Sequence, residues 1–214
     1  MTGPFQYLLL HAFILVLSVV TALLEIQIEG KNGWASKLPT WRIAPQWFRK
    51  LTNRVELTGY HFFLNIFLLL LFHFPVLLIG WSWFLECTIL SCYFTFNIVW
   101  DFLWFVLNPA YGWERYTPKH VWWFERWLGP FPVDYYVVLV ISGLFAALRG
   151  MTADATGSPL LAPLNIPQQQ IIGWACGLLI TIGLTVLLTA VRSHLPVTKQ
   201  TRLPAAFTIL PAQH

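Results

Sequence analysis

Apolar residues fall into five segments, each at or near the length that a helix needs to cross a lipid bilayer. A spanning helix takes about 20 mostly apolar residues, within a range of about 17–25. The fourth segment is the shortest, and Asp134 and Arg149 bracket it. We predict an all-α fold, a polytopic membrane bundle of five transmembrane helices in one integral-membrane domain over residues 1–214. The approximate bounds of the spans are 5–28, 57–79, 83–107, 133–149 and 171–191.

Composition supports a membrane protein and excludes other classes. Of 214 residues, 57% are apolar and 10% are charged, whereas soluble domains carry about 25% charged residues. Such a chain could not cover a water-facing surface with polar groups, which excludes a soluble enzyme, a disordered chain and a collagen-like fibre. Aromatic residues reach 17%, and Trp and Tyr are enriched where membranes meet water.

Basic residues gather in segments that five spans would place on one side of the membrane. Of the 13 Lys and Arg, six lie between residues 29 and 56, three between 109 and 133, and three after residue 191. Only Arg149 falls on the other side. The positive-inside rule makes the basic side cytoplasmic. We therefore expect a protein of the cytoplasmic (inner) membrane, with its N-terminus outside and residues 192–214 as a cytoplasmic tail.

The partners expected from this charge pattern are membrane lipids, because basic residues beside spans lie against anionic headgroups. No Gly-rich phosphate loop, zinc-type Cys/His spacing or RNA-binding signature occurs, so no nucleic-acid partner is expected.

Two predicted cytoplasmic segments, residues 34–51 and 111–128, mix Trp with Arg and Lys. We interpret them as interfacial segments, with rings at headgroup depth and basic side chains in water. The alternative is that they cover a cytoplasmic cavity or bind a partner.

Ionisable residues within spans are costly in lipid and are therefore the first candidates for a functional site. At a rise of about 1.5 Å per residue, their depths form two layers. The outer layer contains His11, His73 and Glu86. The inner layer contains Glu25, Glu29, His61 and Asp101, supported by Asn65 and Asn97, with His120 in reach from a loop.

Histidine and carboxylate side chains in either layer have the composition of a first-row transition-metal site. In the inner layer Glu25, Glu29, His61 and Asp101 are the candidate metal ligands, and Asp101, His61 and Glu25 are the candidate catalytic residues. No histidine box, Glu-x-x-His, His-Glu-x-x-His or Gly-x-Ser-x-Gly motif occurs, so the site depends on how the helices pack. A purely structural network is the alternative, with His61 paired to Glu25 or Asp101 and His73 to Glu86.

Three functions remain open. The first is a membrane enzyme acting on a lipid-like or isoprenoid-like substrate through a metal ion or acid/base groups in the inner layer. The second is an accessory or structural subunit of a larger membrane-protein complex, energy-transducing or pigment-binding. In that case His11 or His73 would bind a haem or a chlorophyll-type pigment. The third is a small proton- or ion-conducting protein.

Overall fold

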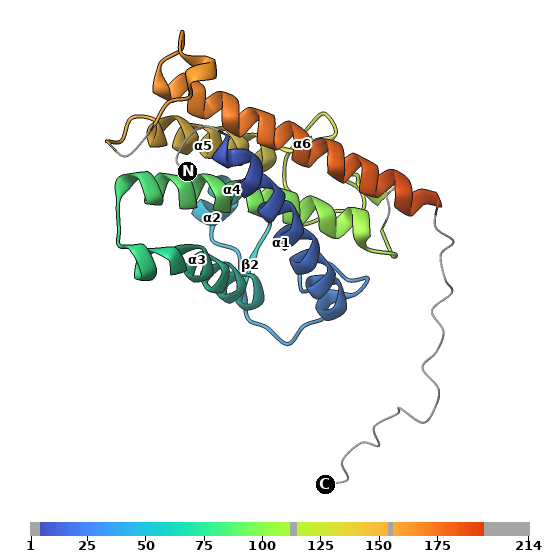
Figure 1. The fold of residues 1–214 in the computed structure, drawn as a ribbon. Helices are drawn as coiled ribbons and strands as arrows, with labels where there is room; N and C mark the ends of the chain where they lie inside the picture. Colours follow the sequence, from blue (N-terminus) through green and yellow to red (C-terminus); the bar gives the residue numbers. More distant parts are fainter. Residues whose placement is uncertain (1–4, 112–114, 154–155, 195–214) are drawn as a thin grey trace, which may run out of the picture.

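Each predicted apolar segment forms a helix in the computed structural model, which describes residues 5–111, 115–153 and 156–194 (Figure 1). From residue 195 onward the predicted cytoplasmic tail lies outside the described residues. A short helix, α2 (Gln46–Thr52), lies in the connection between the first two long helices. The all-α prediction is confirmed for the described residues. The long helices are α1 (Gln6–Glu29), α3 (Gly59–Ile79), α4 (Trp83–Leu107), α5 (Val133–Arg149) and α6 (Ile166–His194).

Four of the long helices are long and apolar enough to cross a membrane: α1, α3, α4 and α6. In α6 the candidate span is Ile166–Val191, longer than the predicted 171–191. The predicted fourth span does form a helix with the expected bounds, but α5 has only 17 residues. The membrane class is therefore supported by four helices of the described chain, while the count of five and the orientation of the termini stay predictions.

A short strand changes where the second span begins. The sequence predicts this span from residue 57, but Leu57–Thr58 forms β2, which pairs antiparallel with β1 (Arg42–Ile43). Thr58 then caps α3, because its hydroxyl accepts a hydrogen bond from the backbone N–H of His61 at 3.2 Å. A side-chain cap of this kind satisfies a backbone donor that has no partner within the helix. The cap also fixes His61 in the first turn of α3.

Helix α4 is the centre of the bundle and α3 lies at its edge. In the apolar window of α4, 61% of residues are buried, against 6% in α3. Helix α4 packs between α1 and α5, α6 covers α1 and α5, and α3 packs mainly on α4 (Figure 1). Ser82 caps α4 three residues after α3 ends, so these two helices are antiparallel neighbours. Most of the surface of α3 is therefore left free to face lipid.

A buried cluster of hydroxyl groups joins α4, α5 and α6. The hydroxyl of Ser142 donates to the carbonyl of Ser91 at 2.8 Å and lies 2.7 Å from the hydroxyl of Thr95. The indole N–H of Trp174 donates to the same Ser142 oxygen at 2.9 Å. Small hydroxyl side chains let helices approach closely and supply hydrogen bonds between them.

Arg149, the basic residue expected on the outer side, is fully buried at the end of α5. Its guanidinium donates to Gln170 of α6 at 2.6 Å and to Gln6 of α1. The same group lies over the rings of Tyr7 and Phe84. Arg149 thus joins α5 to α1, α4 and α6.

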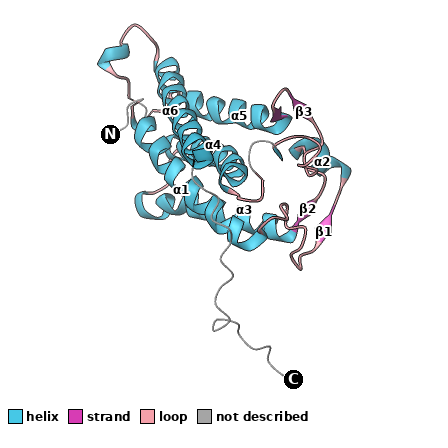
Figure 2. Ribbon diagram, turned by 90° about the vertical axis from the view of Figure 1, so that its right-hand side faces the viewer, coloured by secondary structure: helices cyan, strands magenta, loops and turns pink. Residues whose placement is uncertain are grey.

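The connections before α3 and α5 pack together at one end of the bundle, where Figure 2 shows α2 and the short strands. Strands β3 (Trp127–Leu128) and β4 (Phe131–Pro132) form a hairpin. The two connections are joined by a bridge between Arg54 and Phe124. We call residues 34–58 and 115–132 the aromatic cover. Residues 112–114 of the predicted Trp-rich segment lie outside the described residues.

Tryptophans of the aromatic cover differ in burial. Trp34 and Trp123 are buried, Trp127 is half-buried, and Trp41, Trp47 and Trp122 are exposed. Of the two buried rings, Trp34 lines a cavity, which favours the alternative that these segments cover one. The membrane-interface placement of the exposed rings stays a prediction.

Candidate functional site

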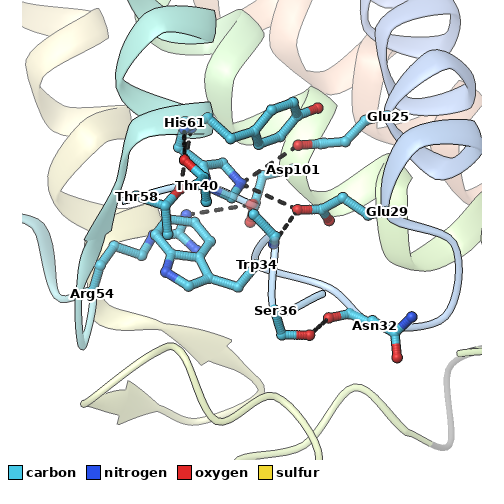
Figure 3. Close-up of polar contacts among 12 residues, drawn as sticks. Glu25, Glu29, Asn32, Trp34, Ser36, Thr40, Arg54, Thr58, His61 and Asp101 are labelled. Atoms are coloured by element: carbon cyan, nitrogen blue, oxygen red, sulfur yellow. Dashed lines mark hydrogen bonds and ion pairs between the residues drawn. The ribbon is translucent and has the colours of Figure 1, made fainter. Parts of the chain in front are cut away.

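Three side chains from two helices converge at the covered end of the bundle (Figure 3). Glu25 and Glu29 lie one turn apart in the last part of α1, so both face the same direction. His61 extends from the first turn of α3 to meet them. One ligand atom from each of the three lies within 4.8 Å of the others, and all three residues are buried. We call Glu25, Glu29 and His61 the inner cluster.

The polar atoms of the inner cluster face one another. His61 Nε2 is 3.6 Å from Glu25 Oε1 and 3.5 Å from Glu29 Oε1. The other ring nitrogen, Nδ1, is 2.7 Å from the hydroxyl of Thr58. When Nδ1–H donates to Thr58, Nε2 carries a lone pair that faces two carboxylates. In that tautomer a proton or a cation between the three acceptors is needed to hold them together.

The turn after α1 fixes the ring of His61 from the other side. Trp34 stacks on the imidazole with 4.0 Å between ring centroids and an interplanar angle of 16°. Trp34 and Ala35 have φ values of 55° and 51°, in a region that residues other than Gly rarely adopt. The Ala35 N–H donates to Glu29 Oε1. The backbone in this rare conformation therefore places the Ala35 N–H against Glu29 and the Trp34 ring against His61.

Asp101 lies beside the inner cluster and has partners of its own. Its Oδ1 accepts from Arg54 Nη2 at 3.3 Å, and its Oδ2 accepts from the hydroxyl of Tyr135 at 2.5 Å. Arg54 Nη2 is also 3.5 Å from Asp134 Oδ2. The structure thus separates the four predicted metal ligands into a group of three and one ion-paired carboxylate. The sequence does not predict this separation, because the position of Arg54 depends on how the connections fold.

Arg54 is the functional candidate that the sequence interpretation missed. Counted there as one of the basic residues facing headgroups, it instead lies over the rings of Phe124 and Trp34, at 3.9 and 4.7 Å from their centroids. Burial by itself lowers the pKa of Arg54, but the carboxylates of Asp101 and Asp134 raise it above its ordinary value, so the guanidinium stays charged. One signal in the sequence could have identified Arg54. Asp101 and Asp134 lie near the inner ends of predicted spans, where a carboxylate requires a basic partner.

A cavity of about 450 Å³ adjoins both groups. Its polar wall includes Glu25, His61, Arg54 and Asp101. The remaining wall extends along α3, α4 and α5 and is mainly apolar; it includes Phe62, Ile66, Leu69, Phe94, Ile98 and Val138. The cavity therefore joins a charged end to a mainly apolar channel, which Asn65, Tyr93 and Asn97 also line.

The predicted outer layer does not assemble as a group of three. His73 Nε2 is 3.3 Å from Glu86 Oε1, and we call these two residues the outer pair. His11 lies elsewhere, buried against α6, where a Cβ on Gly177 would be 2.5 Å from its ring. The imidazole of His11 is 3.4 Å from the hydroxyl of Thr181. His11 faces α6, whereas the outer pair joins α3 to α4; the contact of His11 with α6 is one between distant segments that helical spacing does not predict.

Two of the expected pairings occur, those of His61 with Glu25 and of His73 with Glu86. The expected approach of His120 to the inner layer is wrong. This residue is exposed, because its loop holds it at the surface, where its Nδ1 is 2.9 Å from a threonine hydroxyl of the same loop.

Comparison of the chain with protein-family models, curated proteins and solved structures found no match. Only the geometry and chemistry of the site therefore bear on its function.

Proposed function

We propose that the chain is an integral-membrane enzyme whose inner cluster binds a first-row transition-metal ion and whose substrate is lipid-like. The observation that carries this proposal is the buried convergence of one imidazole and two carboxylates on a single point. Burying a charge is costly unless it is paired or coordinates a metal ion. A divalent cation would offset both carboxylates of the inner cluster at once.

The spacing of the ligand atoms supports this proposal. Ligands about 2.0–2.1 Å from a tetrahedral metal ion lie about 3.4 Å from each other. The distances from His61 Nε2 to the two carboxylates are 3.5 and 3.6 Å. Imidazole with carboxylate is a ligand set that suits zinc, iron and manganese. Three protein ligands beside a cavity leave a coordination position for water or substrate, as in catalytic zinc sites.

The hydrogen bond at His61 Nδ1 provides a second line of support. Histidine ligands of metal ions almost always use the other ring nitrogen in a hydrogen bond, which fixes the ring and its tautomer. Thr58 has this position here. The stacked ring of Trp34 adds a second restraint on the imidazole.

A lipid-like substrate is favoured by the two-part wall of the cavity, with charge at one end and apolar side chains along the rest. A metal-bound water in such a site would serve as a nucleophile. Asp101 lies at the same end of the cavity, where its carboxylate would serve as a general base.

The candidate pigment ligands have other contacts. His73 is close to Glu86 and to the carbonyl of Leu69, and His11 is close to Thr181. The subunit, pigment and ion-conduction hypotheses stay predictions.

The test is metal content rather than activity. The full chain, purified in detergent and stripped with a chelator, is titrated with Zn²⁺, Mn²⁺ or Fe²⁺, and bound metal is measured by mass spectrometry. We expect about one equivalent of one of these ions in the natural protein and loss of binding in Glu25→Gln, Glu29→Gln and His61→Ala.

Glu86→Gln and His73→Ala are the matched controls, because they remove the same chemical groups from the outer pair. They are expected to bind metal as the natural protein does. Equal binding by all five variants, or no stoichiometric binding by the natural protein, would refute the metal site.

A further inference from the structure

The apolar part of the cavity forms a groove along the exposed side of α3. Residues of α3 and α5 line it together with Phe94 and Ile98 of α4. On α3, Phe62 and Ile66 line the groove and are also 39% and 40% exposed. Helix α3 packs mainly on α4 and leaves its remaining surface uncovered by the described residues. The groove is thus accessible from the side of the bundle that faces lipid.

The length of the groove matches one leaflet of a bilayer. It extends from His61 to Leu69 on α3 and from Asp101 to Tyr93 on α4, eight residues in each case. At the helical rise this corresponds to about 12 Å. Half of a hydrocarbon core about 30 Å thick is about 15 Å. An alkyl chain in the groove would therefore lie parallel to the helices, with its polar end at the inner cluster.

An unused hydrogen-bond donor lies at the charged end. Arg54 lines the cavity, and its Nη2 is near both Asp101 and Asp134. Its Nη1 is buried and has no hydrogen-bond partner among the described residues. Native structures rarely leave such donors without an acceptor. A ligand oxygen in the cavity would supply the missing acceptor.

The charges around the cavity select against an anionic headgroup. Four carboxylates, those of Glu25, Glu29, Asp101 and Asp134, lie at the end where Arg54 is the one guanidinium among the described residues that line the cavity. Arg42, which is also near His61, is paired with Glu56. With a divalent ion in the inner cluster, the net charge of these groups would still be negative. A phosphate or carboxylate headgroup would add to that excess, whereas a hydroxyl or carbonyl oxygen would not.

We propose that the groove binds a single-chain lipid with an uncharged oxygen headgroup, such as a fatty alcohol, an isoprenoid alcohol or a monoacylglycerol. The oxygen accepts from Arg54 Nη1 and lies next to the inner cluster, while the chain lies along α3. The lipid enters sideways from the leaflet on the side of the aromatic cover. The proposal rests on the proposed function and names the substrate class of the same site.

Photocrosslinking tests this proposal directly. The full chain in lipid nanodiscs is incubated with a fatty alcohol that carries a diazirine in its chain, irradiated, and mapped by peptide mass spectrometry. We expect labels concentrated on groove residues 62–69 and 94–98. Excess monoacylglycerol should reduce this labelling at least tenfold, and excess lysophosphatidic acid should leave it unchanged.

A matched pair of variants on α5 separates the groove from the general lipid surface. Val138 lines the groove, whereas Val140 is 63% exposed on the same helix. Val138→Trp should reduce labelling of residues 62–69 at least tenfold, and Val140→Trp should not change it. Ile66→Trp repeats the test from α3, and a helical circular dichroism spectrum with a single symmetric elution peak shows that each variant is folded.

Glu29→Gln distinguishes failure of this proposal from failure of the proposed function, because it removes a proposed metal ligand and leaves the groove intact. Retained labelling in Glu29→Gln, with loss of metal, supports both proposals. Groove labelling of a natural protein that binds no metal would refute the metal site alone.

Two other outcomes would overturn the lipid proposal itself. Labels spread evenly over lipid-facing helices, or equal effects of Val138→Trp and Val140→Trp, would overturn the groove. Stronger competition by lysophosphatidic acid than by monoacylglycerol would overturn the uncharged headgroup.

Discussion

The inner cluster and the outer pair begin from the same chemistry, a histidine of α3 beside a glutamate of a neighbouring helix. His61 and His73 lie 12 residues apart, and their Nε2 atoms are 3.6 and 3.3 Å from a glutamate oxygen. Both members of the outer pair have further hydrogen-bond partners nearby. His73 Nδ1 is 2.7 Å from the carbonyl of Leu69, and Trp81 Nε1 donates to Glu86 Oε2 at 3.2 Å. Each of the two side chains thus has a further hydrogen-bond partner outside the pair.

The inner cluster differs in having a second carboxylate, deeper burial and an adjacent cavity. The side chains of His73 and Glu86 are 30% and 21% exposed, whereas those of His61 and Glu29 are 10% and 3% exposed. The C-terminal end of α1 supplies the extra carboxylate, and the aromatic cover closes this end of the bundle. A histidine and a glutamate therefore form a hydrogen-bonded pair at one end of α3. At the other end, with a second glutamate, they form a group that could hold a metal ion.

The largest expected effect comes from Arg54→Met, which leaves two carboxylates at the inner end without their base. Breaking one side of a buried ion pair costs about 3–5 kcal/mol. We expect a loss of this size in the free energy of unfolding, measured by denaturation in detergent. Arg49→Met is the control, because the exposed pair of Arg49 with Glu125 should contribute less than about 1 kcal/mol. Similar losses in both variants would contradict a buried ion pair at Arg54.

Metal affinity is expected to show the sharpest contrast between the two histidines. His61→Ala should weaken binding by more than about 100-fold, because loss of an outer-shell partner alone costs about 10–100-fold. His73→Ala should leave the dissociation constant unchanged. Isothermal titration with the ion found in the natural protein measures both. Equal losses of affinity in the two variants would show that the inner cluster is not a metal site distinct from the outer pair.

A smaller loss is expected when the second nitrogen of the imidazole loses its partner. Thr58→Val removes the hydroxyl near His61 Nδ1 and should weaken metal binding by about 10–100-fold. Thr58→Ser, which keeps the hydroxyl, should retain most of the affinity. Circular dichroism of both variants checks that α3 stays helical without its cap. Equal affinities for the valine and serine variants would show that Thr58 does not position the ring.

The outer pair should give the smallest effect. Glu86→Gln replaces a charged acceptor with a neutral one in a partly exposed contact, so we expect a stability loss of about 1 kcal/mol and no change in bound metal. A shift in thermal unfolding of the detergent-solubilised protein measures it. A loss of stability as large as that of Arg54→Met would mean that the outer pair stabilises the fold as strongly as the buried ion pair of Arg54.

The sequence was sufficient for those parts of the structure that depend on distance along one helix. Apolar length located the helices, and the helical rise placed Glu25, Glu29 and His61 at one depth, where the structure brings them together. Parts that depend on contacts between distant segments could not be obtained this way. Arg54 reaches Asp101 only because the two connections of the aromatic cover pair with each other.

The outer layer shows the same limit of helical spacing. Depth alone placed His11 with the outer pair, but Gly177 and Thr181 of α6 pack against its ring. Those two residues lie more than 160 positions later in the chain than His11. The periodicity of α1 does not indicate which helix packs against His11.

The contact of Arg149 with Gln170 has a consequence for how the chain is assembled in the membrane. Gln170 belongs to α6, the last of the described helices to be synthesised, and it receives a 2.6 Å hydrogen bond from a guanidinium at the end of α5. Until α6 is present, that bond cannot form, and a buried guanidinium that lacks one of its acceptors is costly. Biogenesis of the bundle is therefore completed by α6, and a chain truncated before residue 166 should be a substrate for membrane quality control.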